Sequence, residues 1–163
     1  ALIKLDKKDI DLVINLQGDE PLMKSDDIKN LNSKMIISKS KIGTLASNFL
    51  NKDLYENQNV VKVKTIESLQ VSNFPEAINF MRKTNHSDQN IYHHLGIYCY
   101  DIETLESYVS IKQSSNEIKS KLEQLRALDN NIKINVAQAK SSPIGLDTME
   151  DYVAIKKIME YKS

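Results

Sequence analysis

The side chains best placed to do chemistry follow a short apolar run near the beginning of the chain. In DLVINLQGDEP, the strand-forming residues from Leu12 to Leu16 stop at Gln17, and Asp19 and Glu20 follow just before a proline. An ordinary turn needs only a pair such as Asp-Gly or Pro-Gly. Two adjacent carboxylates are therefore more polar than turning requires, which leaves two interpretations open, a turn or a functional site.

Two other groups of reactive side chains have simpler interpretations. His93 and His94 could together indicate a metal site, but consecutive residues of a strand point to opposite faces, so only one of them is expected to enter a pocket. The single cysteine, Cys99, stands in the apolar stretch GIYCYDI, and we expect a small core residue rather than a nucleophile.

Composition limits the class of protein. A chain of 163 residues with 40% hydrophobic content predicts one domain. The net charge of +0 gives no nucleic-acid footprint and no polybasic membrane patch. One cysteine excludes a disulfide within the chain and favours a reduced, cytoplasmic compartment. No apolar run approaches the ~20 residues of a membrane span, so we expect no membrane partner.

The elements that must position these residues alternate between two periodicities. Strands are predicted at 12–16, 42–49, 60–66, 97–100 and 132–139, whereas 74–82 is ambiguous. Helices are predicted at the tail 2–9, at 25–35, from the capping box of Ser114 and Glu117 to about residue 129, and from Thr148 to about residue 159. The strand 12–16 reads as covered on both faces. This interleaving predicts an α/β fold with a mostly parallel sheet and a ligand site beyond the carboxyl ends of the strands, where QGDEP falls.

These residues resemble one family, the 3-deoxy-manno-octulosonate (Kdo) cytidylyltransferases, also called CMP-Kdo synthetases. VINLQGDEP is followed in family order by NVVKVK (59–64), HHLGIYCY (93–100), LEQLRAL (122–128), IKINVA (132–137) and GLDTMEDY (145–152). Six motifs in the right order are far more specific than any one of them. The resemblance implies a Rossmann-like nucleotide-sugar transferase fold with a mostly parallel mixed sheet.

The resemblance also implies an activity and a site. The family transfers CMP from CTP to Kdo, releases pyrophosphate and supplies CMP-Kdo for lipopolysaccharide biosynthesis, as a cytoplasmic, Mg²⁺-dependent homodimer. By resemblance, Asp19 and Asp147 are the catalytic carboxylates that hold Mg²⁺. Glu20 is expected to be a structural hydrogen-bonding residue before Pro21, and His93 is not expected to be a ligand because His94 is the histidine chosen for the pocket. The sugar pocket is implied to contain Gln17, Arg82, His94, Tyr98, Glu123 and Gln124, with Arg82 on the sugar carboxylate. The alternative for Arg82 is a solvated surface cation.

The family pattern also predicts a missing segment. Family members open with a strand and a glycine-rich, basic loop that cradles the triphosphate of CTP, and nothing in this chain matches it. Residues 1–163 are therefore expected to be the C-terminal two-thirds of a single cytidylyltransferase domain that is inactive alone.

Several positions depart from the commoner family pattern and leave the substrate open. Arg82 is followed by Lys-Thr without the usual prolines, His93 replaces a frequent arginine, and Met149 replaces a frequent proline. A cytidylyltransferase for a related keto-acid sugar, such as amino-Kdo or sialic acid, is the nearer alternative. The more distant alternative is a non-catalytic interaction fragment in which the acidic strand end is only a turn.

Overall fold

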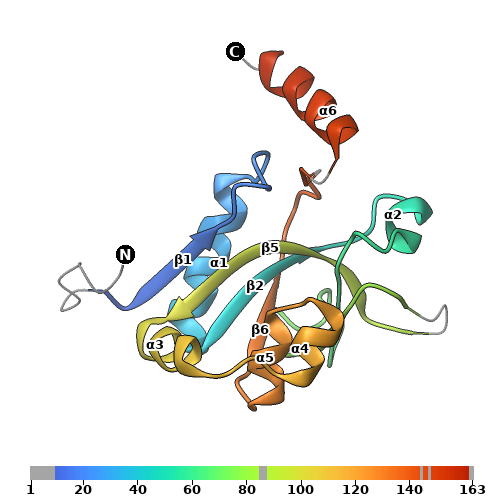
Figure 1. The fold of residues 1–163 in the computed structure, drawn as a ribbon. Helices are drawn as coiled ribbons and strands as arrows, with labels where there is room; N and C mark the ends of the chain where they lie inside the picture. Colours follow the sequence, from blue (N-terminus) through green and yellow to red (C-terminus); the bar gives the residue numbers. More distant parts are fainter. Residues whose placement is uncertain (1–9, 85–87, 144, 147, 162–163) are drawn as a thin grey trace.

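A computed structural model describes residues 10–84, 88–143, 145–146 and 148–161. The predicted helix tail at 2–9 lies outside these residues. The strands are β1 (Leu12–Leu16), β2 (Ile42–Ser47), β3 (Lys62–Thr65), β4 (Ala77–Met81), β5 (Ile91–Asp101) and β6 (Ile134–Gln138). The helices are α1 (Ser25–Ser38), α2 (Lys52–Glu56), α3 (Ile102–Ser110), α4 (Ser115–Ser120), α5 (Gln124–Asp129) and α6 (Met149–Glu160) (Figure 1).

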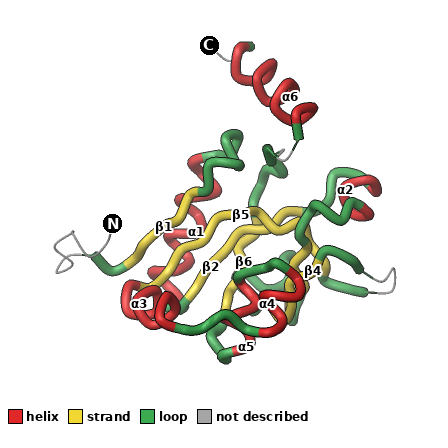
Figure 2. Tube along the Cα trace, in the orientation of Figure 1, coloured by secondary structure: helices red, strands yellow, loops and turns green. Residues whose placement is uncertain are grey.

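The long strand β5 organises the sheet, whose order is β4-β3-β5-β2-β6, with β1 also paired to β5 (Figure 2). Along one side of β5, β3 pairs with residues 91–93 and β1 with residues 97–101. The two strands thus follow one another end to end. The backbone N–H of His94 still donates to the carbonyl of Val61, so the ladder is interrupted at Leu95 and Gly96. On the other side, the β2 register shifts between Thr44 and Leu45, a bulge at the same level.

The prediction of a mostly parallel sheet is wrong for the described strands. Only the pairing of β2 with β6 is parallel, whereas β1, β2 and β3 all pair with β5 in the antiparallel sense, as β3 does with β4. Parallel neighbours require crossover connections of a dozen or more residues. The link from β3 to β4 spans only residues 66–76, and this short connection favours antiparallel neighbours.

The core lies on both faces of the sheet because the strands alternate. In β5, Ile97 and Cys99 pack with Leu31 and Met35 of α1 on one face. Tyr98 and Tyr100 face the opposite way, toward the side chains of α3 and of the α4–α5 pair. Cys99 is thus a buried core residue, as expected. Helices α1 and α4–α5 lie on opposite sides of the sheet in Figure 1, while α6 stands apart from it.

Local chemistry explains which helices were predicted and where they end. Both predicted capping boxes are present, at Ser114 with Glu117 and at Thr148 with Asp151. The helix predicted from the first box is wrong in its length, because Lys121 adopts a left-handed backbone (φ 53°) and divides it into α4 and α5. Helix α3 was not predicted at all.

The strand β1 is less covered than its apolar run indicated. Its residues are partly buried or exposed, and Leu16 is 57% exposed, so the described elements do not cover β1 on both faces. Among the described helices, none is long and apolar enough to cross a bilayer.

Candidate functional site

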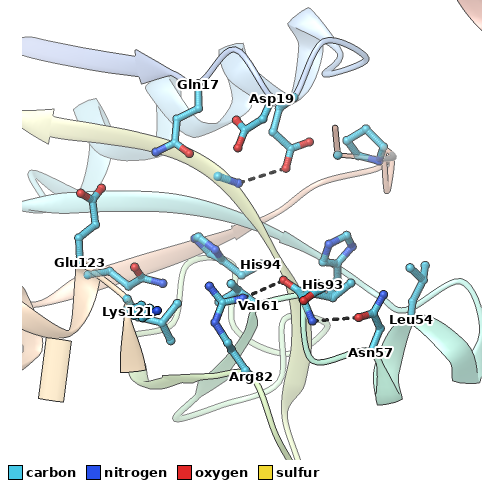
Figure 3. A pocket seen from close by; sticks show the side chains of 18 of the residues that line it. Gln17, Asp19, Leu54, Asn57, Val61, Arg82, His93, His94, Lys121 and Glu123 are labelled. Atoms are coloured by element: carbon cyan, nitrogen blue, oxygen red, sulfur yellow. Dashed lines mark hydrogen bonds between the residues drawn. The ribbon is translucent and has the colours of Figure 1, made fainter. Parts of the chain in front are cut away.

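A cleft of about 1060 Å³ opens where the ladder along β5 is interrupted. Its walls come from the end of β1, the segment before β3, the end of β4, the α4–α5 pair and, after β6, Ser142, Pro143, Gly145, Thr148, Glu150 and Asp151. Figure 3 shows Gln17 and Asp19 at the top, Lys121 and Glu123 at the left and Arg82 at the base. Seven of the eight predicted site residues line this one cleft: Gln17, Asp19, Arg82, His94, Tyr98, Glu123 and Gln124. The eighth, Asp147, lies outside the described residues.

The QGDEP turn fits against Gly96. A Cβ at position 96 would lie 2.9 Å from the side-chain Oε1 of Gln17, so this strand position must be glycine for Gln17 to lie across it. The backbone N–H of Gly96 donates to Oε1 of Glu20 at 3.4 Å. Glu20 therefore anchors the turn to β5, in agreement with the structural role predicted for it.

The GLDT segment also reaches this turn. The backbone N–H of Leu146 donates to the carbonyl of Asp19 at 2.8 Å. Upstream, the buried Asp27 of α1 accepts from the backbone N–H of Lys140 and the hydroxyl of Ser141. Helix α1 and the QGDEP turn thus hold the two ends of the segment that leads from β6 to α6.

Both histidines line the cleft, so the expectation that only one would do so is wrong. The alternation along β5 holds, but the cleft opens across the interrupted edge of the strand and therefore borders both faces. His93 stacks on Phe49, and its Nδ1 lies 3.0 Å from the hydroxyl of Ser142. His94 packs on Phe80 and Tyr98.

Both rings are neutral at physiological pH. Burial lowers the pKa of His93 to about 4, helped by the positive charge of Lys62, and burial lowers the pKa of His94 to about 3. The Thr44 hydroxyl donates its only proton to the carbonyl of Ile97 at 2.7 Å. The Nε2 of His94 lies 2.9 Å from the hydroxyl oxygen of Thr44, which can therefore only accept, so this Nε2 carries the proton and donates it. The Nδ1 of His94 is then a hydrogen-bond acceptor rather than part of a cation.

The cations that line the cleft differ in what they contact. Arg126 binds both carboxylate oxygens of Glu117, with its Nε at 2.8 Å, and this bond is the main reason why the pKa of Glu117 falls to about 2. Arg82 instead donates from its Nη1 to the neutral carbonyls of Asn59 at 3.0 Å and Gln58 at 3.4 Å. Within the described part of the chain no carboxylate pairs with Arg82, so its positive charge is not neutralised beside the cleft.

The α4–α5 wall is held from behind. The Tyr108 hydroxyl donates to the carbonyl of Glu123 at 2.8 Å, and the guanidinium of Arg126 lies 5.1 Å from the Tyr108 ring centre. These contacts fix the start of α5, where Gln124 is buried and Glu123 is exposed. The wall also includes Lys121, which was not predicted as a site residue because the sequence places it inside one continuous helix.

Comparison with known proteins identifies the family. A family model described as Cytidylyltransferase matches residues 1–134. The chain belongs to the cytidylyltransferase family. The 3-deoxy-manno-octulosonate cytidylyltransferase of Bartonella tribocorum is 37% identical over 161 residues, which cover 98% of this chain and 65% of that protein. The enzyme of the same name from Thermodesulfovibrio yellowstonii is 38% identical over 153 residues, 91% of this chain and 60% of that protein. The resemblance predicted from the motifs is thus confirmed.

Solved structures of cytidylyltransferases and related enzymes share the fold. A CMP:2-keto-3-deoxy-manno-octonic acid synthetase complexed with CTP matches 96% of this chain with a TM-score of 0.81 and 26% identity, over 65% of its own length. An apo UDP-glucose pyrophosphorylase matches 93% of the chain with a TM-score of 0.67 and 16% identity, over 55% of its own length, which shows the fold alone. The predicted α/β nucleotide-sugar transferase fold is confirmed. The chain spans just under two thirds of the length of the curated relatives named above.

Proposed function

We propose that this cytidylyltransferase transfers CMP from CTP to Kdo, releasing pyrophosphate and giving CMP-Kdo for lipopolysaccharide biosynthesis. The observation that carries the proposal is the gathering around one cleft of residues from three motifs and the end of β4: Gln17, Asp19, Arg82, His94, Tyr98, Glu123 and Gln124. Named relatives at 37–38% identity supply the substrate class. A cytoplasmic location and a homodimer belong to the proposal through the family resemblance.

The cleft offers the groups that a sugar acid needs. Arg82 carries a positive charge for the carboxylate of Kdo, and its planar guanidinium can bind both oxygens together. Burial, with help from Tyr100 and Glu123, holds the pKa of Tyr98 well above its usual value, so its hydroxyl remains a donor at neutral pH. The neutral His94 and the polar groups of Gln17, Glu123 and Gln124 complete a ring of hydrogen-bonding partners for the sugar hydroxyls.

The chemical step requires little covalent help from the protein. The anomeric oxygen of Kdo forms a bond to the α-phosphorus of CTP, the bond to pyrophosphate breaks, and the hydroxyl proton is released. Such phosphoryl chemistry depends on position and on charge neutralisation. The residues of this cleft would hold the anomeric hydroxyl in line with the phosphorus, and the buried tyrosine and histidine would exclude water from its sugar side.

We propose Asp19 and Asp147 as the Mg²⁺ ligands. Asp19 lines the cleft, and its carbonyl accepts a hydrogen bond from Leu146, the residue that precedes Asp147 in the sequence. Mg²⁺ prefers oxygen ligands and is usually held by one or two carboxylates together with substrate phosphates, which fits this donor set. When bound, Mg²⁺ would neutralise charge on the phosphates.

Pyrophosphate release by the complete gene product, with CTP, Kdo and Mg²⁺, tests the proposal. Because a metal contributes several kcal/mol to such a step, Asp19→Asn and Asp147→Asn should each lower kcat/KM by about 100-fold or more. Asp26→Asn, on the exposed face of α1, is the matched control and should change little. Turnover of amino-Kdo or sialic acid in place of Kdo would assign the related keto-acid sugar. No release with any of the three would overturn the enzymatic proposal.

A further inference from the structure

Lys62 is a fully buried cation whose hydrogen bonds go to carbonyls rather than to a carboxylate. It opens β3, where its backbone pairs between Met81 of β4 and His93 of β5, and its relative exposure is 0%. Its ammonium donates to the carbonyls of Val60 and Arg82, both at 2.9 Å, and to the carbonyl of Asn57. A lysine has three N–H donors, and here each of them has an acceptor.

The same loop is bound by Arg82. The Nη1 of Arg82 donates to the carbonyls of Gln58 and Asn59, while Lys62 takes those of Asn57 and Val60. Four consecutive carbonyls at 57–60 therefore contact two cations. Lys62 also holds the carbonyl of Arg82 itself, so both the backbone and the side chain of Arg82 are tied to this loop. Asn57, Asn59 and Val60 line the cleft beside Arg82.

A buried ammonium is a costly way to fill this strand position. Burial, followed by repulsion from Arg82, lowers the pKa of Lys62. An apolar residue of similar length would fill the same volume without losing hydration, but it would leave the carbonyls of Asn57, Val60 and Arg82 without their donor. Packing alone does not require a lysine at position 62. The three carbonyls require one, because each needs a hydrogen-bond donor.

We propose that Lys62 is a positioning residue for sugar-acid recognition: it fixes the loop 57–60 and the backbone of Arg82, and so aims the Arg82 guanidinium at the carboxylate of the sugar. The inference rests on the proposed function, because the role of Arg82 is part of that proposal. Lys62 itself does not line the cleft and acts only through Arg82 and the loop.

A double-mutant cycle on the 163-residue chain tests this role, with Kdo affinity measured by titration calorimetry. Lys62→Met keeps the chain length and removes all three donors, and it should weaken Kdo binding at least tenfold. In an Arg82→Ala background, the same change should alter the remaining affinity less than twofold, because its effect passes through Arg82. Equal losses in both backgrounds would overturn the proposal. Lys64→Met is the matched control: Lys64 lies in the same strand, pairs with Asp88 at 2.9 Å and should leave Kdo affinity unchanged.

A second measurement does not depend on Kdo. The amides of Asn59 and Val60 donate to Asn57 within the loop, so Lys62→Met should speed their hydrogen exchange at least tenfold while the amides of β2 stay protected. If the unmodified chain binds no Kdo, the sugar-site proposal fails. Unchanged exchange in the loop would still overturn the positioning role separately. If Lys62→Met does not fold, Lys62→Gln, which keeps two donors without the charge, enters the same cycle and should give a smaller effect in the same direction.

Discussion

Arg82 is the residue that carries the electrostatic part of the proposed sugar recognition. Arg82→Ala should weaken binding of Kdo to the chain by about 10–100-fold, since a charge-assisted hydrogen bond contributes ~1.5–3 kcal/mol. Arg82→Lys should recover only part of the loss, because it keeps the positive charge but its ammonium cannot bind both carboxylate oxygens in a fork. Titration calorimetry with Kdo, and with CTP on the complete gene product, measures both effects. An equal loss for the two ligands would place Arg82 in a structural or nucleotide-binding role.

The two cleft histidines predict how stability depends on pH. Their folded pKa values, about 4 for His93 and about 3 for His94, lie below the unfolded value of 6.5. The unfolded chain therefore binds more protons below pH 6.5, and the stability present above that pH is lost progressively as the pH falls toward 4 and 3. Each histidine should add a slope approaching ~1.4 kcal/mol per pH unit inside its window.

Urea unfolding at intervals between pH 7.5 and 4.5 measures this slope. His93→Asn and His94→Asn should each flatten the curve between pH 6.5 and 4.5, whatever they do to stability at pH 7.5. Glu117, whose pKa falls from 4.5 to about 2 on folding, adds its own loss of stability only below about pH 5.5, so the upper part of that interval reports on the histidines. A curve in that interval that is unchanged by both substitutions would mean that the rings are not neutral when folded.

At the scale of elements, two glycines mark close approaches with different consequences. A Cβ at Gly43 of β2 would lie 2.6 Å from the sulfur of Met35 and 3.0 Å from Leu31, both buried in α1. Gly43→Ala should therefore lower the free energy of unfolding by about 1–3 kcal/mol through overpacking and leave the cleft residues in place.

Gly96→Ala should instead weaken Kdo binding more than it lowers the free energy of unfolding. Its Cβ would meet the flexible end of Gln17, which can move away, so the stability loss should stay below that of Gly43→Ala. Moving Gln17 would disturb the sugar side of the cleft and weaken Kdo binding severalfold. Chemical denaturation and Kdo titration on the two variants separate these effects. Stronger loss of Kdo binding in Gly43→Ala than in Gly96→Ala would contradict the placement of Gln17 in the sugar pocket.

The sequence predicted those elements whose signals are local. The apolar run at 12–16 ends where β1 ends, and the two capping boxes start α4 and α6, because each depends on a few neighbouring residues. The direction of β5 was not predictable in this way, since its antiparallel partners come from three distant segments. The break at Lys121 was missed because the stripe from Ile118 to Leu128 continues across it, although Ile118 is 61% exposed.

The whole molecule brings distant motifs to one interrupted edge of β5. The motif residues of the sugar pocket were predicted from the family resemblance and not from their spacing, because contacts such as that between Leu146 and Asp19 join segments more than a hundred residues apart. Lys62 could not be found from its motif, since VVKVK reads as an ordinary half-buried strand with exposed lysines. Its burial is visible only once β3 lies between β4 and β5.

A crystal structure of the complete gene product with Kdo, Mg²⁺ and a CTP analogue that carries a methylene group between the α- and β-phosphates tests the central claim most directly. The account predicts Kdo in the cleft of Figure 3, with its carboxylate on Arg82 and its anomeric oxygen directed at the α-phosphorus. It also predicts Mg²⁺ at ~2.1 Å from carboxylate oxygens of both Asp19 and Asp147. Kdo bound elsewhere, or Mg²⁺ held without Asp19, would contradict it.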